Sequence, residues 1–161
     1  MQSFTLPPDK SMRIAIASDH AAFVLKGELA AWLAEQGYAV ADLGPDSEAS
    51  VDYPDYGYTL AAHIAAGEAE FGVALCGSGI GISIAVNRNP AVRCARVDEP
   101  LSARLAREHN DANVIAMGAR LTGIDMAKAC LDAFLSTEFG GDRHARRVNK
   151  LSNPVFDPDQ T

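Results

Sequence analysis

The stretch Phe71-Gly-Val-Ala-Leu-Cys-Gly-Ser-Gly-Ile-Gly-Ile-Ser83 joins an apolar run to a loop that contains three glycines. The run from Phe71 to Cys76 is short and apolar, which is typical of a strand buried in a parallel sheet. Glycines at 77, 79 and 81 allow the backbone to turn sharply and to point its N–H groups inward, and residues 80–87 are predicted to be helical. A glycine loop between a strand and a helix forms a concavity that binds anions. The stretch therefore predicts one unit of an α/β fold with an anion site.

The same alternation of strand and helix extends in both directions along the chain. A helix with Leu25, Leu29 and Leu33 on one face follows the first strand and ends at Gly37. Strands are predicted at residues 13–17, 38–43, 71–76, 92–97 and 114–117, and further helices at 58–69, 80–87, 100–108, 124–136 and 143–151. Such alternation requires parallel strands joined by right-handed crossovers. We therefore expect a three-layer α/β/α architecture around a five-stranded, doubly wound, Rossmann-like parallel sheet.

Composition limits the classes of function. The chain has 161 residues, of which 48% are hydrophobic, and this fits one domain with a substantial core. Its 14 basic and 21 acidic residues give a net charge of −7, which argues against general nucleic-acid binding. No apolar run approaches the roughly 18 residues that a membrane helix requires, and residues 1–11 do not have the pattern of a secretory signal. We expect a cytoplasmic protein that binds neither nucleic acid nor membranes.

The three cysteines are Cys76, Cys94 and Cys130. An odd number without close C-x-x-C spacing predicts neither a disulfide framework nor a structural zinc site, so we expect reduced thiols. Cys94 and Cys130 fall inside a predicted strand and a predicted helix, which assigns them to the core. No set of His, Cys and carboxylate side chains has the spacing of metal ligands, and no metal is expected.

Polar residues follow several of the predicted strands at the point where each strand ends. Ligands of doubly wound sheets bind beyond the carboxyl ends of the strands. The segments that reach this edge are Asp19-His20, Cys76 to Gly81, Asp98-Glu99 and Gly118 to Arg120. Their clustering is a stronger indication of a site than any single motif.

The glycine loop does not match three familiar phosphate-binding patterns. A dinucleotide fingerprint that starts at Gly77 would need glycine at Ile82, and a Walker loop would need Gly-Lys at Ile82-Ser83. A C-x5-R phosphatase would need arginine at position 82. Cys76 itself has two interpretations, a small buried hydrophobe or a thiolate that is stabilised by the loop and acts as base or nucleophile.

Two further polar motifs also have alternative interpretations. Asp19 can cap the following helix while His20 is exposed, or both can serve a ligand. The run His109-Asn110-Asp111-Ala-Asn113 can consist of turn residues only. A histidine at a helix C-terminus nevertheless holds a proton more readily, which suits proton transfer.

Arg143 and Arg147 are one helical turn apart, so both point the same way, and Asp142 is predicted to cap their helix. A basic helix of this kind is commonly a solvated face. Two guanidiniums at this spacing can also clamp one phosphate through charge-assisted contacts.

Six motifs in order resemble the ribose-5-phosphate isomerase B family of sugar-phosphate isomerases, which also contains galactose-6-phosphate and allose-6-phosphate isomerases. They are Ser18-Asp-His-Ala-Ala22, Val51-Asp-Tyr-Pro54, Cys76-Gly-Ser-Gly-Ile-Gly-Ile-Ser83, Arg107-Glu-His-Asn-Asp111, Met117-Gly-Ala-Arg120 and Arg143-His-Ala-Arg-Arg147-Val148. The resemblance covers about residues 12–151. Residues 1–11, which are polar and contain Pro7 and Pro8, are expected to be a flexible N-terminal extension, and 152–161 a C-terminal tail.

The resemblance implies an aldose–ketose isomerase that moves a proton between C1 and C2 through an enediolate, without cofactor or metal. Cys76 matches the base of one branch of the family, whereas another branch has glutamate at the position of Ile82. Asp19 and His109 match residues that open the sugar ring, and Ser78 to Gly81 match the loop that holds the enediolate oxygen. The residues that match substrate-binding positions are His20, Tyr53, Gly77, Gly79, Gly81, Asn110, Arg120, Arg143 and Arg147, with His20, Arg143 and Arg147 at the phosphate.

The resemblance also implies a homodimer with shared active sites, and dimers that can pair further. Ribose 5-phosphate and ribulose 5-phosphate are the expected substrates, in the pentose phosphate pathway. The same chemistry on a tetrose or hexose phosphate is one alternative, because motifs do not give the length of the pocket. A non-catalytic phosphate or nucleotide sensor is a second alternative, but it would not require Cys76 and His109 together.

Overall fold

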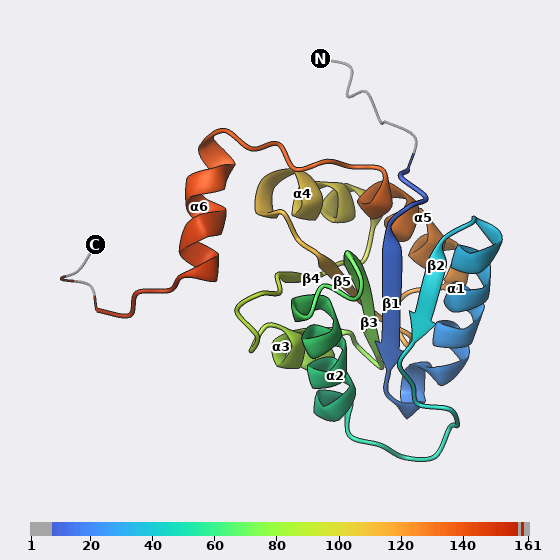
Figure 1. Cartoon of the computed structure of the whole chain (residues 1–161). Helices are drawn as coiled ribbons and strands as arrows, with labels where there is room; N and C mark the ends of the chain where they lie inside the picture. Colours follow the sequence, from blue (N-terminus) through green and yellow to red (C-terminus); the bar gives the residue numbers. More distant parts are fainter. Residues whose placement is uncertain (1–7, 158, 160–161) are drawn as a thin grey trace.

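A computed structural model of the chain describes residues 8–157 and 159. Five parallel strands form one sheet in the order β2-β1-β3-β5-β4 (Figure 1). The strands are β1 (Arg13–Ser18), β2 (Ala39–Asp42), β3 (Phe71–Cys76), β4 (Cys94–Arg96) and β5 (Val114–Gly118). The helices are the short 3₁₀ turn η1 (His20–Ala22), α1 (Phe23–Glu35), α2 (Tyr53–Ala65), α3 (Ile80–Val86), α4 (Pro100–Asn110), α5 (Ile124–Leu135) and α6 (Arg143–Ser152). The expected three-layer, doubly wound architecture is confirmed.

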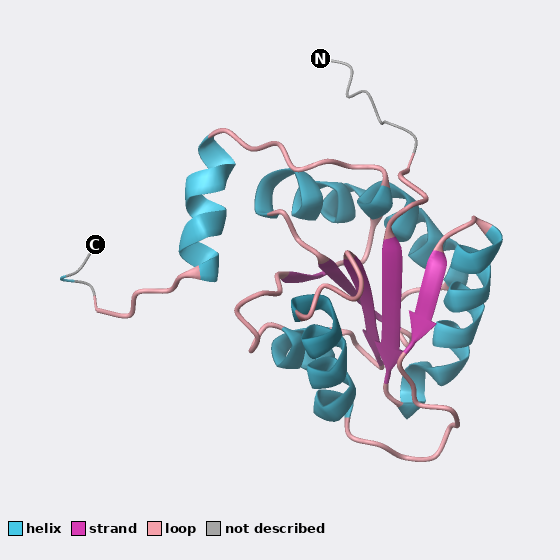
Figure 2. Cartoon of the chain, in the orientation of Figure 1, coloured by secondary structure: helices cyan, strands magenta, loops and turns pink. Residues whose placement is uncertain are grey.

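The two faces of the sheet carry side chains of different size. On β1, Ile14 and Ile16 pack with the layer formed by α1, α4 and α5, whereas Ala15 and Ala17 pack with α2 and α3. Figure 2 shows these helices on the two sides of the strands. The small side chains of the alanine face let α2 and α3 approach the sheet closely. These two helices also lie close to each other, since a Cβ added to Gly57 of α2 would lie 2.9 Å from the Cβ of Ala85 on α3. Burial of both faces explains why the strands read as continuous apolar runs.

The structure corrects the predicted start of α2. We expected this helix at residues 58–69, but it begins at Tyr53 and ends at Ala65. Pro54 lies in the first turn, where its missing N–H is not needed and its fixed φ suits a helix. The C-terminal end of α1 is as predicted, because Gly37 has φ +97° and the N–H of Tyr38 bonds the carbonyl of Leu33 at 3.1 Å.

Strand β4 is shorter than predicted. It was expected over 92–97, but only Cys94–Arg96 pairs with β5 at the edge of the sheet. The N–H of Arg93 donates to the side-chain oxygen of Asn113 at 2.7 Å and therefore leaves the ladder. Cys94 is partly buried and Cys130 fully buried, so the expected core placement holds for Cys130 and only in part for Cys94.

Helix α6 stands beside the body of the molecule instead of covering the sheet (Figure 1). The prediction that Asp142 caps it is wrong, since this side chain makes no capping hydrogen bond. The backbone of Asp142 has φ +52°, outside the extended conformation of an N-cap residue. Backbone carbonyls of Gly141 and Asp142 accept from the N–H groups of His144 and Ala145 instead.

The predicted N-terminal extension, 1–11, is only partly within the described residues, because 1–7 lie outside them. Its last residues contact the domain, where Lys10 Nζ lies 4.0 Å from the centre of the Tyr38 ring. The predicted tail, 152–161, starts with the final residue of α6, and 158, 160 and 161 lie outside the described residues. The domain boundaries stay predictions.

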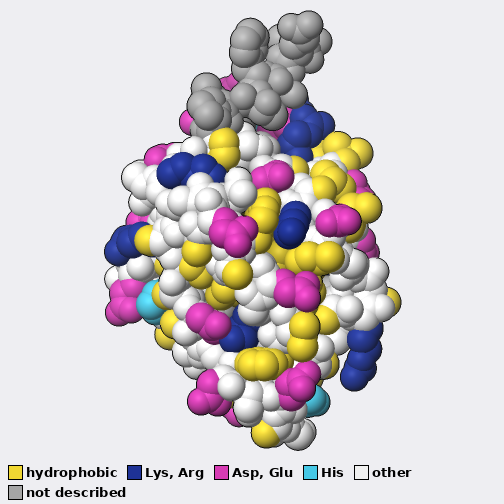
Figure 3. Space-filling model, turned by 90° about the vertical axis from the view of Figure 1, so that its right-hand side faces the viewer, with side chains coloured by type: hydrophobic (Ala, Val, Ile, Leu, Met, Phe, Trp, Pro, Cys, Tyr) yellow, Lys and Arg dark blue, Asp and Glu magenta, His cyan; other side chains and the backbone are white. Residues whose placement is uncertain are grey.

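The face on the side of α1 and β2 carries acidic side chains that are spread among hydrophobic ones and do not gather in one patch (Figure 3). Within residues 8–157 and 159, none of the helices is long and apolar enough to cross a bilayer. An ion pair at the amino end of the sheet links β1 to the residue before β3. Arg13 Nη2 lies 2.6 Å from Glu70 Oε1, and its backbone N–H also donates to this carboxylate.

This ion pair predicts a pH-dependent contribution to stability. Hydrogen bonds from Arg13 lower the pKa of Glu70 from its usual value near 4.5 to about 2. A carboxyl whose pKa is lowered by folding stabilises the protein above its unfolded pKa and loses this effect as pH falls through the folded pKa. The advantage of the wild type over Glu70→Gln should therefore be present at pH 7 and disappear between about pH 4.5 and 2.

Urea unfolding of both proteins across this pH range measures the difference. The contribution at pH 7 should stay below about 1 kcal/mol, because both side chains are partly exposed. Glu28→Gln is the matched control, since within the described residues Glu28 is exposed and forms no ion pair. A difference that persists unchanged at pH 2 would contradict the assignment.

Candidate active site

A cavity of about 290 Å³ opens beyond the carboxyl ends of β1 and β3. Strand order reverses between these two strands, so the loops that follow them diverge and leave space for a ligand. The cavity is lined by Asp19, Tyr53, Cys76, Gly77, Ser78, Gly81, Arg120 and Leu121. The expected edge of the sheet therefore holds a cavity, which brings these residues together from four separate segments of the chain.

Cys76 ends β3 on the face covered by α2 and α3, with a relative exposure of 4%. Its Sγ accepts a hydrogen bond from the backbone N–H of Gly79 at 3.1 Å. The two interpretations of Cys76 are thus compatible, because the residue is buried and its side chain also borders the cavity.

The glycine loop is fixed by direct packing of backbone on backbone. Gly79 has φ +75°, and a Cβ at this residue would lie 2.7 Å from the carbonyl carbon of Met117. In the other direction, a Cβ on Gly118 would lie 2.5 Å from the carbonyl carbon of Ser78. The N–H of Ala119 donates to the carbonyl of Cys76 at 2.9 Å. The end of β5 therefore sets the position of the loop.

Asp19 is buried at the start of the loop after β1, with 6% relative exposure. Its Oδ1 accepts from the N–H of Ala22 at 3.3 Å, so it caps η1 and also lines the cavity. His20 does not line the cavity itself. Its Nδ1 lies 3.1 Å from the backbone nitrogen of Val51 and 3.2 Å from the carbonyl oxygen of the same residue, so the ring is held against the loop before α2.

Tyr53 and Arg120 form the rest of the wall. The Tyr53 ring lies against the start of α3, where a Cβ on Gly81 would come within 2.7 Å of it. The Arg120 guanidinium lies over Gly77, with Nη1 3.2 Å from a Cβ placed there. Among the described residues Arg120 has no ion-pair partner, so its positive charge is available to an anion in the cavity.

The remaining predicted site residues lie elsewhere in the chain. His109 and Asn110 end α4, and Asp111 to Asn113 then lead directly into β5, which places them toward the amino ends of the strands. Asn110 lines a separate groove of about 430 Å³ together with Leu151 at the end of α6. A single chain therefore does not bring His109 or Asn110 to Cys76.

Arg143 and Arg147 are exposed on α6, and neither has an ion-pair partner within the part of the chain that is described. His144, between them, stacks on His109 with ring centres 4.4 Å apart and an angle of 13°. Desolvation and the neighbouring positive groups lower the pKa of His144, with His109 first among those neighbours. The two predicted groups of residues on α4 and α6 thus form one basic surface.

Sequence reasoning missed one residue that lines the cavity and one that contacts its glycine loop. Leu121 is 62% exposed and follows Arg120 on the rim, a position that the motif Met117 to Arg120 could have indicated. Arg96 Nε donates to the carbonyl of Ser78 at 3.0 Å, a contact between segments 18 positions apart that leaves no local signal. Among residues 8–157 and 159, no cluster of three or more His, Cys, Asp or Glu is placed to hold a metal ion.

The packing of the glycine loop predicts that alanine substitutions at Gly118 and at Gly123 differ in their effect on stability. Gly118→Ala should lower the free energy of unfolding by about 1–3 kcal/mol, because the new Cβ meets the backbone of Ser78 and cannot be relieved by a change of rotamer. Gly123→Ala is the control, since a Cβ there has nothing within 4 Å. Urea unfolding measures both, and equal stability of the two variants would show that the loop yields without cost.

Comparison with known proteins gives a consistent result over nearly all of the chain. Residues 14–151 match the sequence profile of the family described as Ribose/Galactose Isomerase. The chain is 43% identical to ribose-5-phosphate isomerase B of Escherichia coli, over 87% of this chain and 94% of that protein. It is 40% identical to the D-erythrulose-4-phosphate isomerase of Pectobacterium atrosepticum, over 87% of this chain and 93% of that protein.

Solved structures agree with the sequence comparison. The ribose 5-phosphate isomerase of Thermotoga maritima is 48% identical and superposes with a TM-score of 0.87, covering 88% of this chain and 98% of that one. The resemblance that six short motifs indicated therefore extends through the whole domain.

Proposed function

The chain is an isomerase of the ribose/galactose isomerase family, and we propose that it interconverts ribose 5-phosphate and ribulose 5-phosphate without a cofactor. The observation that carries this proposal is Cys76, whose Sγ accepts an N–H hydrogen bond at the wall of a cavity with a free arginine. A C–H next to a carbonyl is a weak acid, so its removal needs a positioned base and donors for the charge that develops on oxygen.

In the proposed reaction the Cys76 thiolate takes the proton from C2 of the open-chain aldose, which forms an enediolate. The proton returns to C1, and the hydroxyl proton of O2 moves to O1, so the ketose has the same atoms as the aldose. N–H groups of the loop from Ser78 to Gly81 stabilise the enediolate oxygen. Gly77, Arg120 and Tyr53, which line the same cavity, hold the sugar.

Ring opening and phosphate binding involve the second group of residues. Asp19 and His109 are proposed to move a proton between the ring oxygen and a hydroxyl, with Asn110 beside them. His20, Arg143 and Arg147 are proposed to bind the phosphate, and phosphate binding energy holds the open chain against the base. Because His109, Arg143 and Arg147 lie away from Cys76 of their own chain, they serve a site on another copy.

A homodimer is the smallest assembly that meets this requirement, and a dimer of dimers meets it too. Apolar side chains beside the cavity support such an interface, since Ile80 and Ile84 of α3 are 51% and 53% exposed and Leu121 is on the rim. Exposed apolar groups on one face commonly mark a protein contact. The three free cysteines fit the cytoplasm, where thiols stay reduced, and the reaction fits the pentose phosphate pathway.

A tetrose phosphate is the second candidate substrate, because a relative of 40% identity is named for D-erythrulose 4-phosphate. A hexose phosphate would require the same chemistry in a longer site. Purified protein assayed against four-, five- and six-carbon aldose phosphates decides between them by kcat/KM. A protein that binds these compounds but converts none would be the non-catalytic module instead.

Cys76→Ala should reduce isomerisation by about 10²- to 10⁴-fold, because a positioned base contributes this much to proton transfer. Inhibition by inorganic phosphate should stay within twofold, since the phosphate ligands are distant from this side chain. Cys94→Ala is the matched control, as Cys94 lies on β4 outside the cavity and should retain activity. Turnover of ribose 5-phosphate near the wild-type rate by folded Cys76→Ala would remove the thiolate from the mechanism.

Shared sites predict complementation between two inactive variants. Cys76→Ala and His109→Asn should each be slow on ribose 5-phosphate as homodimers. A mixed dimer has one site with both changes and one site with neither. Random co-assembly should therefore restore about a quarter of the wild-type activity per site.

Native mass spectrometry of the co-expressed variants gives the fraction of mixed dimers, and the rate is normalised to it. Mixed dimers without recovered activity would show that His109 acts within its own chain or outside the site.

A further inference from the structure

Asp111 occupies an unusual position directly after α4. Its backbone is in the left-handed region, with φ +45°, which few residue types other than glycine, asparagine and aspartate adopt. The carboxylate of Asp111 binds two arginine side chains. Arg107 Nη1 donates to Oδ1 at 2.9 Å, and Arg93 Nη2 donates to Oδ2 at 3.2 Å. One carboxylate therefore holds two guanidiniums that would otherwise repel each other.

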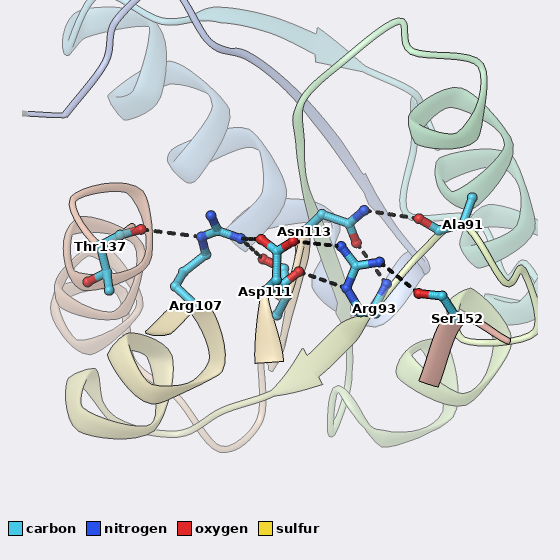
Figure 4. A network of polar contacts seen from close by, with 8 residues as sticks. Ala91, Arg93, Arg107, Asp111, Asn113, Thr137 and Ser152 are labelled. Carbon is cyan, nitrogen blue, oxygen red and sulfur yellow. Dashed lines mark hydrogen bonds and ion pairs between the residues drawn. The ribbon is translucent and has the colours of Figure 1, made fainter. Parts of the chain in front are cut away.

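Each of these arginines also contacts one end of the segment 137–152, which runs from just after α5 through α6 (Figure 4). Arg107 Nε donates to the carbonyl of Thr137, before α6, at 3.3 Å. Arg93 Nη1 donates to the hydroxyl of Ser152, the last residue of α6, at 3.4 Å. Both ends of the segment are thus tied to the residue that follows α4.

Helix α6 has few apolar contacts that could fix it instead. Val148 is its one buried residue, and the helix stands apart from the body of the molecule (Figure 1). Its other links to α4 are the hydrogen bond from Gly140 to the carbonyl of Glu108 at 2.9 Å and the stack of His144 on His109. The placement of α6 against α4 therefore depends on polar contacts. Hydrogen bonds weaken steeply when their distances and angles change, whereas apolar packing is non-directional.

We propose that Asp111, through Arg93, Arg107 and Ser152, positions His109 and the pair Arg143 and Arg147 as one unit. The inference rests on the proposed function, in which His109 acts at the sugar ring and the arginines bind the phosphate. The sugar ring and the phosphate belong to one small substrate. The imidazole and the guanidiniums must therefore keep a suitable separation to act on it together. Asp111, Arg93 and Ser152 do not touch the substrate and are positioning residues.

Three variants loosen this unit to different degrees. Ser152→Ala removes the contact at the end of α6 only. Arg93→Lys keeps the charge, but a single ammonium cannot reach both Asp111 and Ser152 in place of a planar fork. Asp111→Asn keeps the size of the side chain and tolerates positive φ, yet it removes the charge between the two arginines.

Ser152→Ala and Arg93→Lys should each raise the KM for ribose 5-phosphate and the inhibition constant of inorganic phosphate by about three- to tenfold. Their kcat should change by less than twofold, because Cys76 and its loop are not affected. Asp111→Asn should also lower kcat on ribose 5-phosphate, since it releases His109 as well. A purely structural role would reduce the folded fraction, and would therefore lower kcat and leave KM and the inhibition constant unchanged.

Arg13→Lys is the matched control, because it makes the same change in the Arg13–Glu70 pair at the amino end of β1 and should alter none of these constants. Arg147→Ala tests the proposed phosphate clamp itself, and it should raise the inhibition constant of inorganic phosphate at least about 30-fold. No change in Arg147→Ala would contradict the proposed phosphate clamp. A large change in Arg147→Ala with wild-type constants in Arg93→Lys and Ser152→Ala would overturn the positioning role alone. Asp111→Asn need not fold for this comparison, as the two milder variants decide it.

Discussion

Close contact between the glycine loop and the end of β5 is the constraint on which the site depends. Backbone atoms of Ser78 and Gly79 approach those of Met117 and Gly118 so closely that no side chain fits between them at either glycine. The contact follows from the strand order, because β3 and β5 are neighbours and their carboxyl ends share one level of the sheet. It sets where the N–H of Gly79 lies, and this N–H bonds the sulfur of Cys76. The proposed base therefore has its sulfur oriented by a backbone group of its own loop.

The chain divides the proposed functional groups between two ends of the sheet. Cys76, Asp19 and Arg120 lie beyond the carboxyl ends, and His109 lies at the other end with the basic helix α6. Parallel crossovers impose this division, since a helix that follows one strand returns to the amino end of the next. A site that used both groups would be built by association, and α3, whose Gly81 lines the cavity, also carries the exposed apolar side chains Ile80 and Ile84.

Sequence patterns predicted the layers and most of the elements because apolar runs and helical periodicity are local. They predicted β3 at the residues where the structure has it, and they indicated the edge of the sheet that holds the cavity. They failed at Tyr53, where a helix starts one residue before proline, and at Asp142, whose backbone geometry prevents capping. Contacts such as Arg93 with Ser152 join residues 59 positions apart, so composition and spacing carry no trace of them. The placement of α6 was unpredictable for the same reason.

The unequal faces of the sheet affect how this fold can change over evolutionary time. The layer under α1, α4 and α5 is built from branched side chains, which can exchange volume with their neighbours through new rotamers. The strands present mainly alanines to α2 and α3, namely Ala15, Ala17, Ala74 and Ala116, and alanine has no rotamers with which to absorb a larger neighbour. Drift in sequence should therefore accumulate in the first layer, while the second keeps a nearly constant spacing. Cys76 belongs to the second layer, so the spacing of that layer determines where its sulfur lies relative to the cavity. The position of the sulfur can therefore stay the same while residues of the first layer are substituted.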